Sequence, residues 1–183
     1  PEEFERLVDR HGKSPIQFLK NNGIIDLPVA KLLIHGLYAS AADLKALKDQ
    51  RVVLGYCPYS QVQFGFPAHV NAWNQYGLEI SIGTDCGASN DSMDVQQELR
   101  LAAGGYAFGI TNSPAMRTFF STGKKEQAKA IEALRLHQRT SQQAMLTTDK
   151  LLDAVWQTPG TLPPHFRCGA IEPTFLANIA IWD

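Results

Sequence analysis

Three polar segments of this sequence each follow a short apolar run, and their residue types could carry chemistry. His35 follows residues 31–34, Cys57 follows residues 51–56, and Asp85 follows residues 78–82. A carboxylate can bind a hard or borderline metal and accept a proton from metal-activated water, whose pKa falls from about 15.7 to about 7. A neighbouring histidine can orient the hydroxide or stabilise developing charge. Asp85 and His35 are therefore candidate catalytic residues, and Asp85 is also a candidate metal ligand. The structural alternatives are that Asp85 caps the turn after its strand and that His35 is a hydrogen-bonded core histidine.

These residues need a fold that brings the ends of separate strands together. The apolar runs predict three strands, and helical patterns over 41–49, 67–76 and 94–106 follow them in turn. This alternation predicts an α/β fold with a parallel sheet, and the nearly continuous apolar runs suit strands buried on both faces. Active sites of such folds gather at the carboxyl ends of the strands. We therefore expect the His35 imidazole and the Asp85 carboxylate to converge on a shared water molecule.

The remaining segments are expected to be mostly helical. Ser40 is a candidate N-cap with Asp43 at the third helical position. The Phe- and Gly-containing stretch before Pro67 predicts a loop, and residues 169–183 predict a return to strand. Further helices are expected to begin near Phe4 and Pro15 and to cover 124–137, 141–146 and 148–156.

Composition excludes several classes of protein. The 183 residues are 44% hydrophobic with a net charge of -1, so the basic surplus of a nucleic-acid or anionic-membrane binder is missing. No apolar run is long enough to span a membrane, and no signal peptide is recognisable at the start. The three widely spaced cysteines favour free thiols in a reducing compartment. We expect a cytoplasmic protein that binds neither nucleic acid nor membrane.

Three motifs together resemble the amidohydrolase superfamily, in particular its cytosine, guanine and adenosyl-type deaminases and its triazine hydrolases. The motifs are His35-Gly36, Cys57-Pro58-Tyr59-Ser60-Gln61 and Gly83-Thr84-Asp85-Cys86-Gly87-Ala88-Ser89-Asn90. The resemblance implies the C-terminal part of a TIM (β/α)8 barrel, with strands six to eight and their helices in residues 1–165. Residues 166–183 would then begin the return strand into a small β domain.

The same resemblance implies a metal-dependent hydrolase. The expected reaction is hydrolytic deamination of an amino-substituted heterocycle, such as a purine, pyrimidine, pterin or triazine. Asp85 would bind one divalent metal ion, zinc or alternatively iron, and act as general base, while His35 would contact the water or the substrate. Two alternatives remain open: hydrolysis of a halide or cyclic amide on the same scaffold, and a non-catalytic fragment.

Part of the family's ligand set is missing from the sequence. The resemblance implies a His-x-His motif and a His-x-x-Glu motif in an N-terminal part of the same barrel, with the second motif ending just before Pro1. It also implies a homodimer for the full-length protein. Gln61 replaces a usual Asn, and Asn178 replaces a common Asp of the final strand.

Other residues near the motifs have both a functional and a structural interpretation. Ser89 and Asn90 are candidate substrate-binding residues, although Ser and Asx turns explain them equally well. Phe64 could stack on a planar heterocycle, against the default of core or interface packing. Cys57 and Cys86 are expected to be packed thiols rather than ligands or nucleophiles.

Overall fold

The computed structural model describes residues 2–66, 68–104, 116, 123–143 and 146–179. Within them, β1 (Lys31–Ile34), β2 (Val52–Tyr56) and β3 (Glu79–Ile82) form one parallel sheet in the order β1-β2-β3. The register pairs Ile34 with Gly55 and Tyr56 with Ile82, so the three strands end close together. The predicted α/β fold with a parallel sheet is confirmed, and each strand lies within one residue of its predicted bounds.

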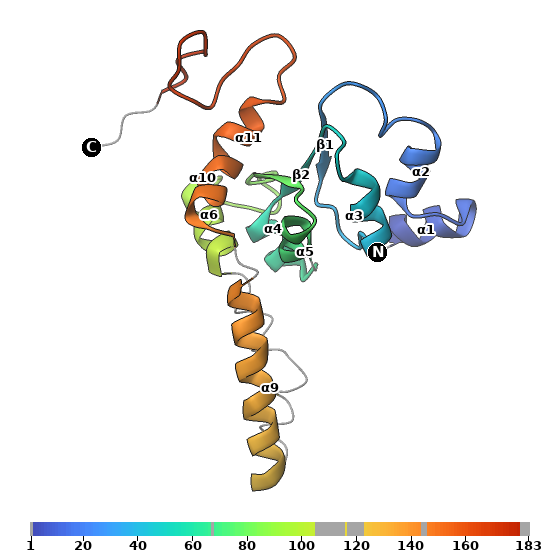
Figure 1. Cartoon of the computed structure of the whole chain (residues 1–183), viewed down its shortest axis with the longest axis vertical. Helices are drawn as coiled ribbons and strands as arrows, with labels where there is room; N and C mark the ends of the chain where they lie inside the picture. Colours follow the sequence, from blue (N-terminus) through green and yellow to red (C-terminus); the bar gives the residue numbers. More distant parts are fainter. Residues whose placement is uncertain (1, 67, 105–115, 117–122, 144–145, 180–183) are drawn as a thin grey trace.

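Helices lie beside both outer strands of the sheet (Figure 1). The first three lie beside β1, whereas α6, α10 and α11 contact β3. The long α9 extends away from the sheet and its neighbouring helices. The helices are α1 Glu2–His11, α2 Pro15–Asn21, α3 Ala41–Leu47, α4 Pro58–Phe64, α5 Val70–Gln75, α6 Val95–Gly104, α9 Lys124–Gln143, α10 Thr148–Val155 and α11 Gln157–Gly160.

Side-chain caps explain where several of these helices begin. Ser40 and Asp43 form the predicted capping box of α3, in which each side chain accepts a hydrogen bond from the other residue's backbone N–H. Thr147 caps α10 through the backbone N–H of Lys150, and Ser14 caps α2. Each cap satisfies an amide that has no partner inside its helix.

Helix α4 corrects the prediction of a loop before Pro67. Pro58 occupies the first helical turn, where its missing N–H costs nothing, and Gly65 ends the helix in the left-handed conformation. The N-cap residue Cys57 makes no side-chain capping bond. The proline and the glycine were the signals for this helix that the sequence offered.

The C-terminal region also differs from the prediction. Residues 124–143 form one continuous helix, whereas two helices were expected over 124–137 and 141–146. The predicted strand over 169–183 does not form in its described part, 169–179, which consists of turns, bends and irregular backbone. A strand needs a hydrogen-bonded neighbour, and the described residues offer this segment none. The division of the chain at residue 165 stays a prediction.

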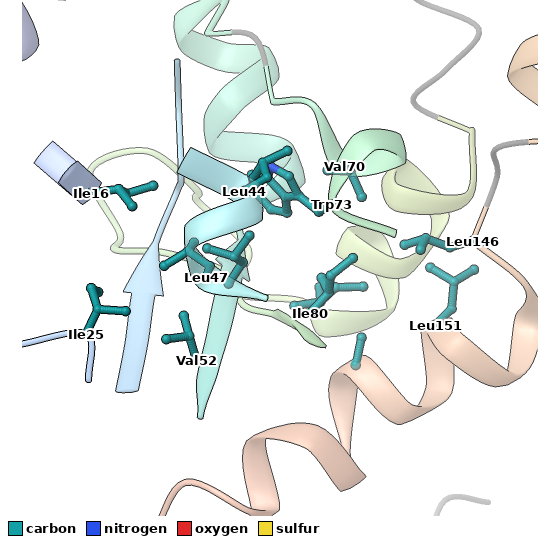
Figure 2. Packing of buried hydrophobic residues seen from close by; sticks show 13 residues of the cluster. Ile16, Ile25, Leu44, Leu47, Val52, Val70, Trp73, Ile80, Leu146 and Leu151 are labelled. Atoms are coloured by element: carbon teal, nitrogen blue, oxygen red, sulfur yellow. The ribbon is translucent and has the colours of Figure 1, made fainter. Parts of the chain in front are cut away.

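The hydrophobic core lies between the sheet and its helices (Figure 2). Leu54 of the central strand and Trp73 of α5 are completely buried. The Trp73 ring meets Tyr56 edge to face, with ring centroids 6.2 Å apart, an arrangement favoured by the aromatic quadrupole. Leu44 and Leu47 of α3 pack on the β1 side, whereas Leu146 and Leu151 pack on the β3 side.

The described residues leave both outer edges of the sheet open. Within the described part of the chain, β1 and β3 each pair with the central strand alone. Leu32 and Ile34 of β1 keep 44% and 57% of their surface exposed. This leaves one apolar face of β1 without a cover. No helix among the described residues is both long and apolar enough to cross a membrane.

Gly36 is expected to be sensitive to substitution because it combines two constraints. It has a φ of +49°, and a Cβ there would lie 2.9 Å from Cζ2 of Trp73. Gly36→Ala should therefore reduce the free energy of unfolding through backbone strain and also through overpacking, which alone costs about 1–3 kcal/mol. Urea unfolding measures the loss.

Gly65→Ala provides the matched control for this substitution. Gly65 has a φ of +65°, but nothing lies within 4 Å of its added Cβ. This variant should show the backbone strain without the clash. Equal losses of unfolding free energy in the two variants would contradict the packing of Trp73 against Gly36.

Candidate functional site

The two outer strands bring His35 and Asp85 together. His35 directly follows β1, whereas Asp85 lies three residues beyond Ile82, the last residue of β3. The two outer strands lie about 10 Å apart because β2 separates them at about 4.8 Å per step. His35 Nε2 nevertheless lies 3.7 Å from Asp85 Oδ2. Both residues adopt a left-handed backbone, with φ of 70° and 62°. The expected convergence of these two side chains is therefore present at the carboxyl edge of the sheet.

Hydrogen bonds keep the Asp85 carboxylate charged. Ser60 Oγ donates to Asp85 Oδ2 over 2.7 Å, and the backbone N–H of Cys86 donates to Oδ1 over 2.9 Å. The bond from Ser60 is the main cause that holds the pKa of Asp85 below its ordinary value, with the Cys86 N–H and the His35 charge adding to it. Partial burial acts in the opposite direction. Asp85 is therefore ionised at neutral pH, as a metal ligand or general base must be.

The His35 ring is held at the end of β1 and offers a free nitrogen. Its backbone N–H continues the ladder by donating to the Gly55 carbonyl over 2.7 Å. Its Nδ1 atom is buried and has no hydrogen-bond partner among the described residues. A buried ring nitrogen without a partner is costly, so this atom is suited to a ligand or to a further polar group.

Cys57, at the end of the central strand, completes a cluster of three possible metal ligands. The candidate ligand atoms of His35, Cys57 and Asp85 all lie within 4.8 Å of one another. Nitrogen, thiolate sulfur and carboxylate oxygen are the donors that zinc accepts, so the cluster fits this metal. Burial, followed by the charges of Asp85 and Glu98, raises the pKa of Cys57 to about 11. Cys57 is packed, as expected, whereas Cys86, which was also expected to be packed, is exposed. A metal at Cys57 would have to displace the thiol proton.

A buried glutamate from α6 bonds to residues next to this cluster. Glu98 is completely buried, and its Oε2 accepts a hydrogen bond from the Tyr59 backbone N–H over 2.9 Å. Its Oε1 accepts from Asn90 Nδ2 over 2.5 Å. Burial is the main cause that raises the pKa of Glu98, against the effect of these two bonds. Glu98 was not predictable from the sequence, because no local pattern reveals a contact between residues 39 positions apart.

The structure gives Ser89 and Asn90 partners inside the protein. Asn90 is 1% exposed, and its Nδ2 also donates to the Thr84 carbonyl over 3.0 Å. Ser89 is buried, and its Oγ donates to the Cys86 carbonyl. Substrate binding by these two residues therefore stays a prediction. Their observed bonds shape the loop that carries Asp85.

Phe64 lies at the end of α4 rather than in a loop. Its side chain is 54% exposed and stacks on Phe66, with ring centroids 5.7 Å apart and an interplanar angle of 28°. Trp73, another aromatic residue a few positions further along the sequence, is instead completely buried in the core. Phe64 is therefore accessible for stacking, whereas its contact with a substrate stays a prediction.

Sequence comparison identifies relatives that are named as deaminases. The chain is 33% identical over 103 residues to a 5-methylthioadenosine/S-adenosylhomocysteine deaminase from Halobacterium salinarum, which covers 56% of this chain and 23% of the relative. It is 31% identical over 115 residues to the deaminase of the same name from Moorella thermoacetica, covering 62% and 26%. The chain thus spans about a quarter of the length of these curated relatives. No model of a known protein family matches the chain.

Structure comparison finds the same fold in larger zinc-containing proteins. An adenosine deaminase from Xanthomonas campestris with bound zinc matches with a TM-score of 0.68 and 19% identity, covering 96% of this chain and 33% of that chain. The atrazine chlorohydrolase of Arthrobacter aurescens, as an E241Q mutant complexed with zinc and atraton, matches with a TM-score of 0.70 and 17% identity, covering 97% and 33%. The predicted resemblance to deaminases is confirmed by these relatives in sequence, and the likeness to a triazine hydrolase is one of fold.

The hydrogen bond from Ser60 should control the charge of Asp85 in the metal-free protein. Ser60→Ala should raise the pKa of Asp85 toward its ordinary value, since that bond is the largest lowering cause. Ser89→Ala should raise the pKa of Asp85 less, because the bond from Ser89 is the smallest of the lowering causes. An NMR titration of the carboxyl carbon measures both shifts, and a larger shift in the Ser89 variant would contradict the assignment.

The same bond implies a pH-dependent stability. A carboxyl group whose folded pKa is lowered adds stability that is present above its unfolded pKa and is lost as pH falls through the folded value. The stability advantage of the wild type over Ser60→Ala should therefore shrink on acidification. Denaturant unfolding at a series of pH values measures this advantage.

Proposed function

We propose that this chain is part of a metal-dependent hydrolase that removes an amino group from a heterocycle by attack of water. The observation that carries the proposal is the 3.7 Å approach of His35 Nε2 to Asp85 Oδ2 at the carboxyl edge of a parallel sheet. Active sites of parallel α/β folds form at this edge. Relatives named as deaminases and a zinc-containing adenosine deaminase of the same fold add independent support.

The three strands are proposed to be strands six, seven and eight of a TIM barrel. In that arrangement β1 would receive strand five on its free edge, and the exposed Leu32 and Ile34 would be covered. The match to about a third of two larger proteins supports this proposal. The N-terminal part of the barrel would supply the His-x-His and His-x-x-Glu motifs.

The proposed metal is a single zinc ion held by Asp85, with His35 and Cys57 within reach as further donors. A bound zinc ion supplies the Lewis acidity that makes water a nucleophile at neutral pH. Ionised Asp85 would accept the proton of the attacking water, because its carboxylate oxygens retain acceptor capacity beyond their bonds to Ser60 and Cys86. His35 would orient that water through the ring nitrogen that faces Asp85.

The substrate class is proposed to be a planar aminated ring. The exposed Phe64, together with Phe66, which follows the C-cap, forms an aromatic surface at the C-terminal end of the helix that also carries Ser60. A heterocycle stacked on this surface would bury apolar area on a rigid platform. Ser89 and Asn90 would contribute by holding the shape of the loop after β3, whether or not they contact the ring.

A second candidate is hydrolysis with a different leaving group. It is favoured by the fold match to the atrazine chlorohydrolase at a TM-score of 0.70. Incubation of the protein with 5-methylthioadenosine, adenosine and atrazine, followed by assays for ammonia and chloride, separates the two candidates. Ammonia from an aminated purine supports deamination, and chloride from atrazine without ammonia supports the second candidate.

Asp85→Asn should reduce turnover by roughly 10²–10⁴-fold, the range for loss of a general base. Asparagine retains the shape of the side chain but can neither accept the proton nor supply a charged metal ligand. Asp91→Asn is the control, because Asp91 is an exposed carboxylate a few residues along the same loop. Near-normal turnover by the Asp85 variant would exclude the proposed reaction.

Metal removal tests the third possibility, a non-catalytic protein. Dialysis of the protein, as its gene encodes it, against a chelator should abolish turnover, and added zinc should restore it. Elemental analysis before dialysis should find about one zinc per chain. Absence of a tightly bound metal together with absence of turnover would favour the non-catalytic alternative.

A further inference from the structure

We infer that Glu98 is a positioning residue that fixes the Asp85 carboxylate from two sides at once. Glu98 forms no hydrogen bond or ion pair with Asp85 or His35, but each of its two oxygens begins a chain of contacts that ends at Asp85. The inference rests on the proposed function only for the catalytic role of Asp85. The contacts themselves can be tested without a substrate.

The first chain of contacts runs through α4. The N-cap residue Cys57 makes no capping bond, so the amide of Tyr59 in the first helical turn depends on another acceptor. Glu98 Oε2 provides it from α6, which packs against α4. The next residue, Ser60, donates to Asp85 Oδ2 over 2.7 Å. Glu98 therefore fixes the helical turn that directs the Ser60 hydroxyl at the carboxylate.

The second chain of contacts runs through the loop after β3. Asn90 Nδ2 donates to Glu98 Oε1 and also to the carbonyl of Thr84, the residue before Asp85. Asn90 Oδ1 accepts a bond from the Ser92 backbone N–H, which holds its amide in this orientation. Glu98 therefore fixes the backbone from which the left-handed Asp85 projects.

Only a carboxylate satisfies both chains of contacts. The Tyr59 N–H and the Asn90 amide are both donors, so the side chain between them must present two acceptors. Glutamine has one acceptor oxygen, and its amide nitrogen would face a donor. Because Glu98 is completely buried, bulk water cannot readily replace the lost bond. An apolar residue would avoid the cost of burying an acid, which indicates a role other than packing.

The test compares Glu98→Gln with Leu99→Ala in the full protein as its gene encodes it. Leu99 is the next residue on the same helix and packs against the core, so its truncation destabilises α6 without touching either chain of contacts. Hydrogen exchange by mass spectrometry reports local opening. Glu98→Gln should accelerate exchange roughly tenfold or more in residues 57–64 and 84–92, since hydrogen bonds to a charged group are lost. Leu99→Ala should not single out these two segments.

Turnover provides the second readout. Glu98→Gln should lower kcat by roughly 10²-fold, the cost of about 1 Å of misplacement, while leaving KM nearly unchanged. Because Glu98 acts partly through Ser60, the loss in a Ser60→Ala/Glu98→Gln double variant should be smaller than the product of the single losses. If Glu98 had a purely structural role, the kcat losses of the two single variants would multiply in the double variant. A Leu99→Ala variant with the same melting temperature as Glu98→Gln would then show the same loss of kcat.

The outcomes separate this inference from the proposed function. Faster exchange in both segments supports the inference even when no substrate is turned over. Unchanged exchange there, or a uniform increase that Leu99→Ala matches, overturns it. If Glu98→Gln does not fold, Asn90→Ala tests the second chain alone: exchange should rise in 84–92 but not in 57–64, and the reverse result overturns the inference.

Discussion

Parallel pairing of three short strands is the constraint on which the candidate site depends. The register pairs Ile34 with Gly55, and Gly55 with Ser81 of β3, so the strands end at a common edge. The residues that follow them, His35, Cys57 and Asp85, therefore meet although they come from distant parts of the sequence. A slip of one residue would turn every side chain of a strand to its opposite face. The buried core beneath the edge, centred on Leu54 and Trp73, opposes such a slip because it would expose apolar surface.

The sequence predicted the strands well because each is a short apolar run bounded by turn residues, and the buried β2 shows the pattern most clearly. The helix α4 was missed because Cys57 offers no capping side chain, and the bond that replaces the cap comes from α6. The predicted strand near the C-terminus shows the opposite limit. Its residues favour extended backbone, but a strand also needs a partner, which residue preferences in one segment cannot provide.

The candidate site was predictable to the extent that position along the chain determines position in space. His35 and Asp85 follow predicted strands, so a parallel sheet implies their proximity. The contacts that set their properties were not predictable in this way. The bond from Ser60 to Asp85 depends on how α4 begins. The burial of Glu98 depends on how α6 packs against α4. Cys57 shows that a thiol can be packed, as its residue type favours, and still lie beside the other two side chains.

The left-handed backbone at residues 35 and 85 also limits how this sequence can change over time. Histidine, asparagine, aspartate and glycine tolerate such a conformation better than other residues, and β-branched side chains are strongly disfavoured. A descendant that no longer performed any chemistry would still favour these residue types at both positions. Retention of an imidazole or a carboxylate there among distant homologues would reflect the geometry of the strand ends as well as selection for activity.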